Sequence, residues 1–254
     1  MNQLMIFIKK EFIESIKTKR FLIAEIIFVL FGLMNPLLAK LMPKIIGSTL
    51  PKGASAAIPA PTSLDSWTQF FKNMTQLGLI ILVILFCDIV SHELANGYLI
   101  NFLTKGLSRW VVVLSKQLLV WFVWTISLIT TFLVTVGYTN YYFNDHLSRH
   151  LFPAVFALWL FGLLLMTVVV TGSTVSANGM KGLLITGAFY ALGMFSTVFT
   201  GLKKINPFSL INQNMQFLQG KQSLGEYGVA LAITVILMLI GLAISLILFN
   251  RKRV

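Results

Sequence analysis

His92 and Glu93 match the start of a zinc-hydrolase motif. In that motif two histidines four residues apart on one helix face bind the metal, and the glutamate acts as general base. The second histidine would stand at position 96, where the sequence has Asn96. The residues therefore disfavour an intramembrane hydrolase, which stays only as an alternative.

The other reactive side chains are few. His146 and His150 are four residues apart, but Asp145 is the one acid beside them, and the single cysteine is Cys87. A phosphate-binding loop needs Gly-x-x-x-x-Gly-Lys followed by Ser or Thr, so that backbone amides and the lysine hold the phosphates. Residues 220–222 come nearest, and they read Gly-Lys-Gln. We expect no catalysis, no metal and no cofactor in this chain.

The rest of the sequence has the composition of a membrane protein. Of its 254 residues 57% are hydrophobic and 11% are charged, whereas soluble domains have about 25% charged residues. Six stretches are apolar enough to cross a bilayer, which takes about 20 helical residues. They are 21–42, 72–92, 115–138, 152–173, 182–202 and 228–249. They lack the polar alternation of a membrane barrel strand. The sequence predicts an all-α polytopic protein with six transmembrane helices.

The basic residues predict the topology. Twenty Lys and Arg against eight Asp and Glu give a net charge of +12. If both termini are cytoplasmic, twelve basic residues lie inside and eight outside, at about twice the density inside, as the positive-inside rule requires. No basic run exceeds three residues, so nucleic acid is not an expected partner. We expect a multi-pass plasma-membrane protein with cytoplasmic N- and C-termini.

Residues 1–20 are predicted to form an amphipathic elbow helix at the cytoplasmic surface, which leaves 21–254 as the transmembrane domain. Apolar residues recur at steps of three and four, and charged residues take the other side. The apolar set is Met5, Ile8, Phe12 and Ile16. Such a helix either anchors the chain on anionic lipid or also meets a cytoplasmic partner.

Two outside connections differ in character. Residues 43–71 contain four of the seven prolines, which predicts an extended extracellular loop. Residues 203–227 begin with Lys203 and Lys204 and then become largely apolar. This pattern predicts a short re-entrant or interfacial segment at the outer surface.

Glu25 and Asp88 are the two acids expected inside the spans, each about one turn from the cytoplasmic end. Ionisable residues in a membrane are costly and are usually paired or functional. We expect Glu25 to pair with Arg20 or Lys19, and Asp88 to pair with Lys116. The alternative is a role in substrate access or proton coupling.

Residues 93–110, between the second and third spans, are the most regularly patterned cytoplasmic segment. Gly97 can end the preceding helix and Ser108 can cap the next one. Between them, apolar residues recur at helical spacing. These residues are Leu99, Phe102, Leu103 and Leu107. The pattern predicts a short, rigid amphipathic helix that projects from the bundle.

This arrangement resembles the ABC-2 family of export permeases. In that family an acid, a glycine, a short helix, a Ser-Arg pair and a lysine follow the second transmembrane helix. The matching residues are Glu93, Gly97, the helix from Tyr98 to Thr104, Ser108 with Arg109, and Lys116. The basic elbow before the first span and the Asn206-Pro207-Phe208 segment are also similar. Tyr98 and Asn96 depart from the residues that the family often has there.

The resemblance implies that the helix contacts a separate ATPase. The coupling residues implied are Glu93, Gly97, Tyr98, Leu99, Phe102, Leu103, Thr104, Ser108 and Arg109. The chain would be the permease subunit of an ATP-binding cassette exporter, paired with a second permease subunit and with ATPase subunits that bind ATP and Mg²⁺. The charge-poor interior suits an amphipathic or hydrophobic peptide, lipid or drug. Length and layout resemble exporters of phenol-soluble modulins, which are amphipathic peptides. A membrane scaffold or receptor without transport is the alternative.

Overall fold

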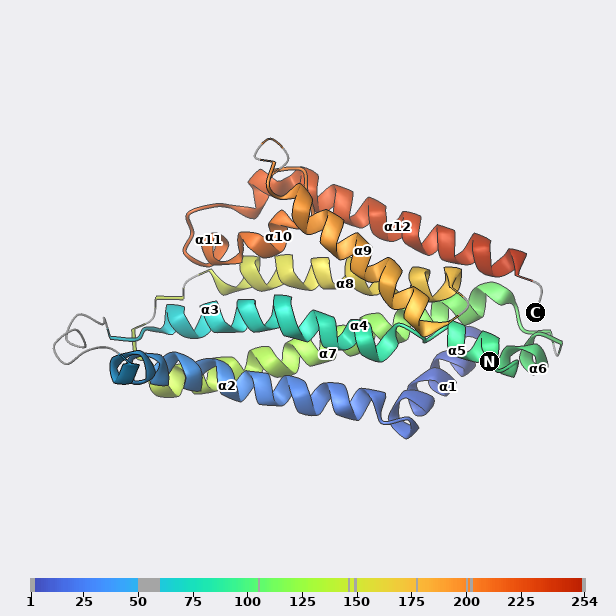
Figure 1. The fold of residues 1–254 in the computed structure, drawn as a ribbon, viewed down its shortest axis with the longest axis horizontal. Coiled ribbons are helices and arrows are strands. Elements are labelled where there is room, and N and C mark those ends of the chain that lie inside the picture. The colour runs from blue at the N-terminus through green and yellow to red at the C-terminus, as the bar shows by residue number, and fades with distance from the viewer. Residues whose placement is uncertain are drawn as a thin grey trace.

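The computed structural model is a bundle of helices that lie side by side along one long axis (Figure 1). It describes residues 3–49, 60–104, 106–145, 147–148, 150–176, 178–199, 201 and 203–252. These residues contain no strand, which confirms the all-α prediction. The α-helices are α1 (Gln3–Lys17), α2 (Arg20–Thr49), α3 (Ser63–Asn73), α4 (Leu79–Phe86), α5 (Ser91–Ala95), α6 (Tyr98–Thr104), α7 (Arg109–Tyr142), α8 (Leu151–Val175), α9 (Gly179–Ser196), α10 (Ser209–Asn212), α11 (Asn214–Leu218) and α12 (Gly228–Arg251).

The two ends of the bundle carry different elements. Helices α1, α5 and α6 and the end of α12 lie at one end, together with both chain termini, and we call this the terminal end (Figure 1). The start of α3 and the short helices α10 and α11 lie at the opposite end. The long helices connect the two ends in alternating directions.

Five helical stretches are long and apolar enough to cross a membrane: Arg20–Ile45, Ser63–Ala95, Arg109–Tyr142, Leu151–Val175 and Leu224–Arg251. They correspond to five of the six predicted spans. The predicted span 182–202 corresponds to α9, which has 18 residues and packs along α8. Because a perpendicular crossing takes about 20 residues, the count of six stays a prediction.

The described residues of the connection predicted as a loop over 43–71 are largely helical. Helix α2 continues through Pro36 and Pro43 to Thr49, and α3 begins at Ser63. Neighbouring helices in a membrane bundle can compensate the hydrogen bond that a proline removes, which the sequence reading did not allow for. Residues 50–59 lie outside the described part of the chain. The predicted outer segment 203–227 contains α10, α11 and a 3₁₀ turn at Leu224–Tyr227, and its membrane placement stays a prediction.

Helix α7 is held to α2 and α3 by hydroxyl groups at every fourth position. Ser127, Thr131, Thr135 and Thr139 are all buried. Thr131 Oγ1 donates to the carbonyl oxygen of Phe28 at 2.9 Å, and the hydroxyls of Ser66 and Thr139 are 2.7 Å apart. Hydrogen bonds of this kind fix the relative position of membrane helices because apolar contacts with lipid and with protein are nearly equivalent.

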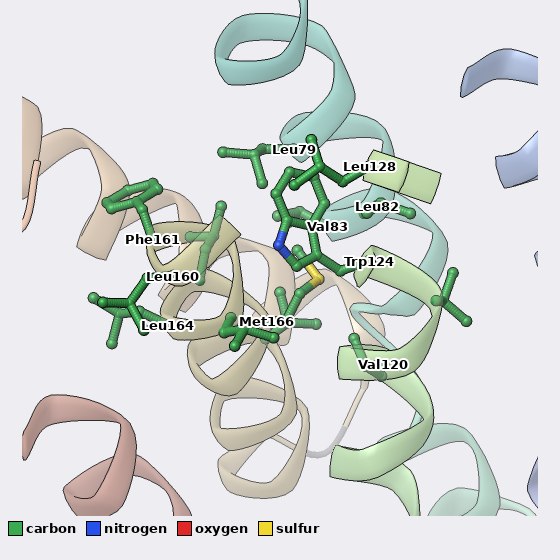
Figure 2. Packing of buried hydrophobic residues seen from close by; sticks show 14 of the residues in the cluster. Leu79, Leu82, Val83, Val120, Trp124, Leu128, Leu160, Phe161, Leu164 and Met166 are labelled. Atoms are coloured by element: carbon green, nitrogen blue, oxygen red, sulfur yellow. The ribbon is translucent and has the colours of Figure 1, made fainter. Parts of the chain in front are cut away.

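Another face of α7 is fixed to α8 by indole side chains. Trp124 is fully buried, and its Nε1 donates to the carbonyl oxygen of Trp159 at 2.9 Å. Figure 2 shows the indole at the centre of the core, among side chains of α4, α7 and α8. The ring lies directly over Gly162, where any side chain would overlap it. Helix α7 therefore connects α2 and α3 on one side of the bundle with α8 on another.

Replacing Gly162 by alanine should destabilise the protein by roughly 1 to 3 kcal/mol, because overpacking a filled core has this cost. A Cβ atom at position 162 would stand 2.1 Å from the Trp124 ring. The thermal unfolding midpoint of the purified protein in detergent measures the effect. Gly137→Ala is the matched control, since its Cβ would meet nothing within 4 Å. Alanine favours a helix by up to about 1 kcal/mol, so this control should keep or raise the midpoint. Equal midpoints for the two variants would contradict the packing described.

Candidate functional site

Four charged side chains form a closed ring at the terminal end. Lys116 Nζ lies 2.9 Å from Glu11 Oε2 and 2.8 Å from Glu93 Oε2. Lys10 Nζ lies 3.0 Å from Glu11 Oε1 and 2.6 Å from Glu93 Oε1. We call Lys10, Glu11, Glu93 and Lys116 the charge ring. It connects three separate helices: α1, α5 and α7.

Three members of the charge ring are almost completely shielded from solvent. Glu11, Glu93 and Lys116 are 2%, 3% and 1% exposed. Removing an ion from water costs several kcal/mol, and only close partners of opposite charge can offset that cost. Each member has two such partners in the ring. Loss of any one would leave a buried charge without its full compensation.

Lys10 stays positively charged at neutral pH. Partial burial alone would lower the pKa of Lys10, but attraction by Glu11 and Glu93 outweighs burial and raises this pKa above its ordinary value. A raised folded-state pKa stabilises the fold at every pH below the unfolded value, and the contribution disappears only as the pH rises above it. The Lys10 contacts therefore do not weaken across the physiological range.

Glu11, Glu14 and Glu93 have the spacing of a metal site, with carboxylate oxygens within 4.8 Å of one another. Lys10 Nζ occupies the point on which they converge, because it is also 2.7 Å from Glu14 Oε2. An ammonium group has three N–H donors, and here each meets a different carboxylate. Glu93 is thus held between two lysines and is not placed as a general base beside His92, which is exposed. The three carboxylates therefore hold the side chain of Lys10.

The second histidine pair gives no site among the described residues. His150 immediately precedes α8 at the opposite end of the bundle, and its ring lies beside Gly220. His146 lies outside the part of the chain that the structure describes.

Helix α6 has the limits predicted for the projecting helix. Gly97 and Gly106 flank it with φ values of +69° and +88°, in the region that favours glycine. Leu99 is fully buried, whereas Tyr98 and Phe102 are 57% and 41% exposed. Within its two turns, the helix therefore has one side that packs on the bundle through Leu99 and another side that is exposed.

Helix α6 is packed against α1. The rings of Phe7 and Phe102 meet edge to face with centroids 5.8 Å apart. Gln3 Nε2 donates to the carbonyl oxygen of Gly106 at 3.5 Å. The amphipathic elbow and the projecting helix are thus one packed unit, a contact that the sequence reading did not predict.

Three other predicted residues lie at the end of this segment. Thr104 is the last residue of α6 and is exposed. Ser108 is at the N-cap position of α7, as predicted, although its side chain makes no capping hydrogen bond. Leu103 belongs to α6, and its side chain is outside the described part.

Arg109 points into the bundle and contacts the end of α12. Its guanidinium donates to the carbonyl oxygens of Asn250 and Lys252 at 3.0 and 2.6 Å. A cation at a helix C-terminus satisfies free carbonyls and interacts favourably with the helix dipole. Lys252 Nζ in turn donates to the carbonyl oxygen of Ser176 at 3.3 Å. Arg109 therefore links the start of α7 to the last transmembrane helix.

The predicted partners of Asp88 and Glu25 are wrong. Asp88 forms a two-point ion pair with Arg20, with contacts of 2.9 and 3.0 Å, and Glu25 accepts a hydrogen bond from Ser127 at 2.7 Å. The cause is the turn after α1. Lys19 has a φ of +62°, and the chain bends there; Arg20 begins α2 and is paired with Asp88.

Sequence reasoning missed Glu11, which takes the place expected for Asp88 beside Lys116. One signal was present: Phe7, Glu11 and Ser15 follow one another at four-residue spacing, and they are the buried residues of α1. A glutamate on the same stripe as a phenylalanine faces protein and needs a buried cation.

The bundle and its terminal end define a polytopic helical membrane protein with a short exposed helix fixed to the core by buried charges. A sequence model described as "ABC-2 family transporter protein" matches residues 5–254. The chain is also 24% identical over 183 residues to the uncharacterized transmembrane protein YxlG of Bacillus subtilis (strain 168), over 69% of each chain. This protein belongs to the ABC-2 transporter family, as the motifs around Glu93 indicated.

Lys116→Met should destabilise the protein by about 3 to 5 kcal/mol, because two buried carboxylates lose their shared cation. Adding Glu11→Gln should recover part of the loss, since one of the uncompensated charges is then removed. Thermal unfolding midpoints of the purified single and double variants measure both effects.

Lys17→Met is the control, since Lys17 is an exposed lysine of α1 and surface substitutions usually change stability by less than about 0.5 kcal/mol. If the Lys116 and Glu11 substitutions were simply additive, the charge ring would not be an energetic unit.

Proposed function

We propose that this protein is the permease subunit of an ATP-binding cassette exporter, driven by separate ATPase subunits that bind ATP and Mg²⁺. The observation that carries the proposal is the position of the charge ring. Glu93 lies four residues before Gly97, which immediately precedes the exposed helix α6, and it forms ion pairs with both α1 and α7. A movement imposed on α6 from outside therefore has a direct connection to a transmembrane helix.

The two sides of α6 have different tasks in this proposal. Tyr98 and Phe102 present an apolar, partly aromatic surface for contact with the ATPase, and such residues commonly dominate protein interfaces. Leu99 and Phe7 keep the helix attached to the bundle from below. Gly97 and Gly106 form sharp turns at its ends, and in this proposal α6 would move between them as one rigid body. ATP-driven closure of the partner would thus displace α1, α5 and α7 together.

The proposed substrate is an amphipathic or hydrophobic molecule, such as a peptide, lipid or drug. An open groove of about 480 Å³ lies at the terminal end, between the α4–α5 turn and the start of α9. Its lining combines polar and apolar side chains, among them Arg20, Asp88, His92, Ile84, Met180 and Leu183. A groove with both kinds of lining fits a molecule that has a polar and an apolar part.

The proposal also includes the membrane in which the protein lies and the subunits with which it assembles. The protein lies in the plasma membrane with its terminal end in the cytoplasm, where the ATPase is, and a second permease subunit, identical or different, completes the transport path. A scaffold or receptor without transport would share the fold. It would not need an ATPase on α6, and this difference separates the two functions experimentally.

Tyr98→Asp with Phe102→Asp should abolish co-purification with the ABC ATPase subunit of the proposed exporter, because charges replace the apolar contact surface of α6. Pull-down of the tagged permease after co-expression measures the complex. Tyr141→Asp is the control, because Tyr141 is 79% exposed at the opposite end of α7. A complex that survives both α6 substitutions in a folded protein would refute the proposed contact.

The topology can be tested with single cysteines in a Cys87→Ser background. Lys44→Cys, at the exposed end of α2, should react with a membrane-impermeant maleimide on intact cells. Thr18→Cys, in the exposed turn between α1 and α2, should react only after permeabilisation. The opposite labelling pattern would place the terminal end outside the cell.

A further inference from the structure

The charges of α1 are sorted between its two faces. Both acids of the helix, Glu11 and Glu14, are bonded to Lys10 on the side that meets the bundle. The outward face therefore carries no acid. It consists of Met5, Ile6, Lys9, Ile13, Ile16 and Lys17.

The outward face is both apolar and basic. Met5, Ile6, Ile13 and Ile16 are all more than one third exposed. Lys9, Lys17 and the neighbouring Lys19 are exposed as well, and none of them forms an ion pair within the described ranges. Both acids of α1 are paired with Lys10, so the positive charge of this face is available to an external anion.

The position of this face is set by the first transmembrane helix. Arg20–Ile45 is long and apolar enough to cross a membrane, and α1 ends at Lys17, just before it. The left-handed turn at Lys19 bends the chain there, so α1 departs from the direction of α2 just before the apolar stretch begins (Figure 1). Isoleucines with interspersed lysines at that depth are typical of a helix that lies on an anionic bilayer.

We propose that the outward face of α1 binds anionic phospholipid through Lys9, Lys17 and Lys19. Lipid is a better occupant than a soluble protein because the face carries large apolar side chains beside a transmembrane helix, and lipid covers them continuously. Since Lys10, on another side of α1, holds Glu93, a lipid that fixes α1 also fixes the base of α6. Placement in the cytoplasmic leaflet rests on the proposed topology, whereas lipid binding itself does not.

The full-length protein in mixed micelles with equal amounts of phosphatidylglycerol and phosphatidylcholine provides the first test. After re-purification, phosphatidylglycerol should be enriched among the bound lipids. Each basic residue near an anionic surface contributes about five-fold in affinity, so Lys9→Gln with Lys17→Gln and Lys19→Gln should lower the enrichment about ten-fold or more. Added salt should lower the enrichment of the unmodified protein, because it screens exposed charges.

Two matched variants make the result specific. Lys44→Gln with Lys203→Gln and Lys221→Gln changes the net charge equally with exposed lysines away from α1, and it should keep the enrichment. Replacing Lys9, Lys17 and Lys19 by arginine keeps the charge and should also retain it. Thermal unfolding midpoints show whether every variant is folded.

Hydrogen–deuterium exchange provides the second test. In nanodiscs that contain phosphatidylglycerol, amides of α1 and α6 should exchange several-fold more slowly than in phosphatidylcholine alone, and the α1 glutamine variant should lose this difference. Equal enrichment in the two triple glutamine variants would overturn the proposal, as would equal exchange rates of α1 and α6 in the two kinds of nanodisc. Neither measurement requires the ATPase or transport. Failure of the lipid proposal can therefore be told apart from failure of the transport proposal.

Discussion

A charge that leaves water must keep a counter-charge, and this constraint determines the terminal end of the molecule. Lys116 lies about two turns inside α7, where solvent does not reach it, and it is tolerable only because Glu11 and Glu93 contact it from both sides. To bring these carboxylates there, α1 must bend away from α2 onto α7, and the helix must be interrupted between α4 and α5. The geometry of three helices thus follows from one ammonium group.

The same constraint explains the other links at this end. Arg20 is paired with Asp88, and Arg109 satisfies the free carbonyls at the end of α12. Farther along the bundle, neutral contacts replace ionic ones, such as the Ser66–Thr139 hydrogen bond and the indole of Trp124 over Gly162. Buried ion pairs thus lie at the terminal end, and neutral hydrogen bonds and packing contacts lie along the bundle. The strongest polar contacts are therefore concentrated where the exposed helix α6 is attached.

The sequence predicted what depends on length, composition and local backbone preference. Apolar stretches gave five of the helical spans, and Gly97 with the apolar spacing after it gave α6 with its limits. It did not predict which acid meets Lys116, because that depends on the turn at Lys19, a non-glycine residue in a left-handed conformation. Helix α2 was predicted too short for a similar reason: whether a proline such as Pro43 ends a helix depends on neighbours that spacing does not reveal.

Helical geometry makes α1 a connection between two surfaces. Successive residues in an α-helix point about 100° apart, so Lys9, Lys10 and Glu11 leave the helix in three directions. Lys9 faces outward, and Lys10 and Glu11 enter the charge ring. A rigid helix of fifteen residues that is charged on one side and paired on the other cannot shift at one surface without moving at the other. Helix α1 and the projecting helix α6 are therefore positioned together, through the ion pair of Lys10 with Glu93 and the contact of Phe7 with Phe102.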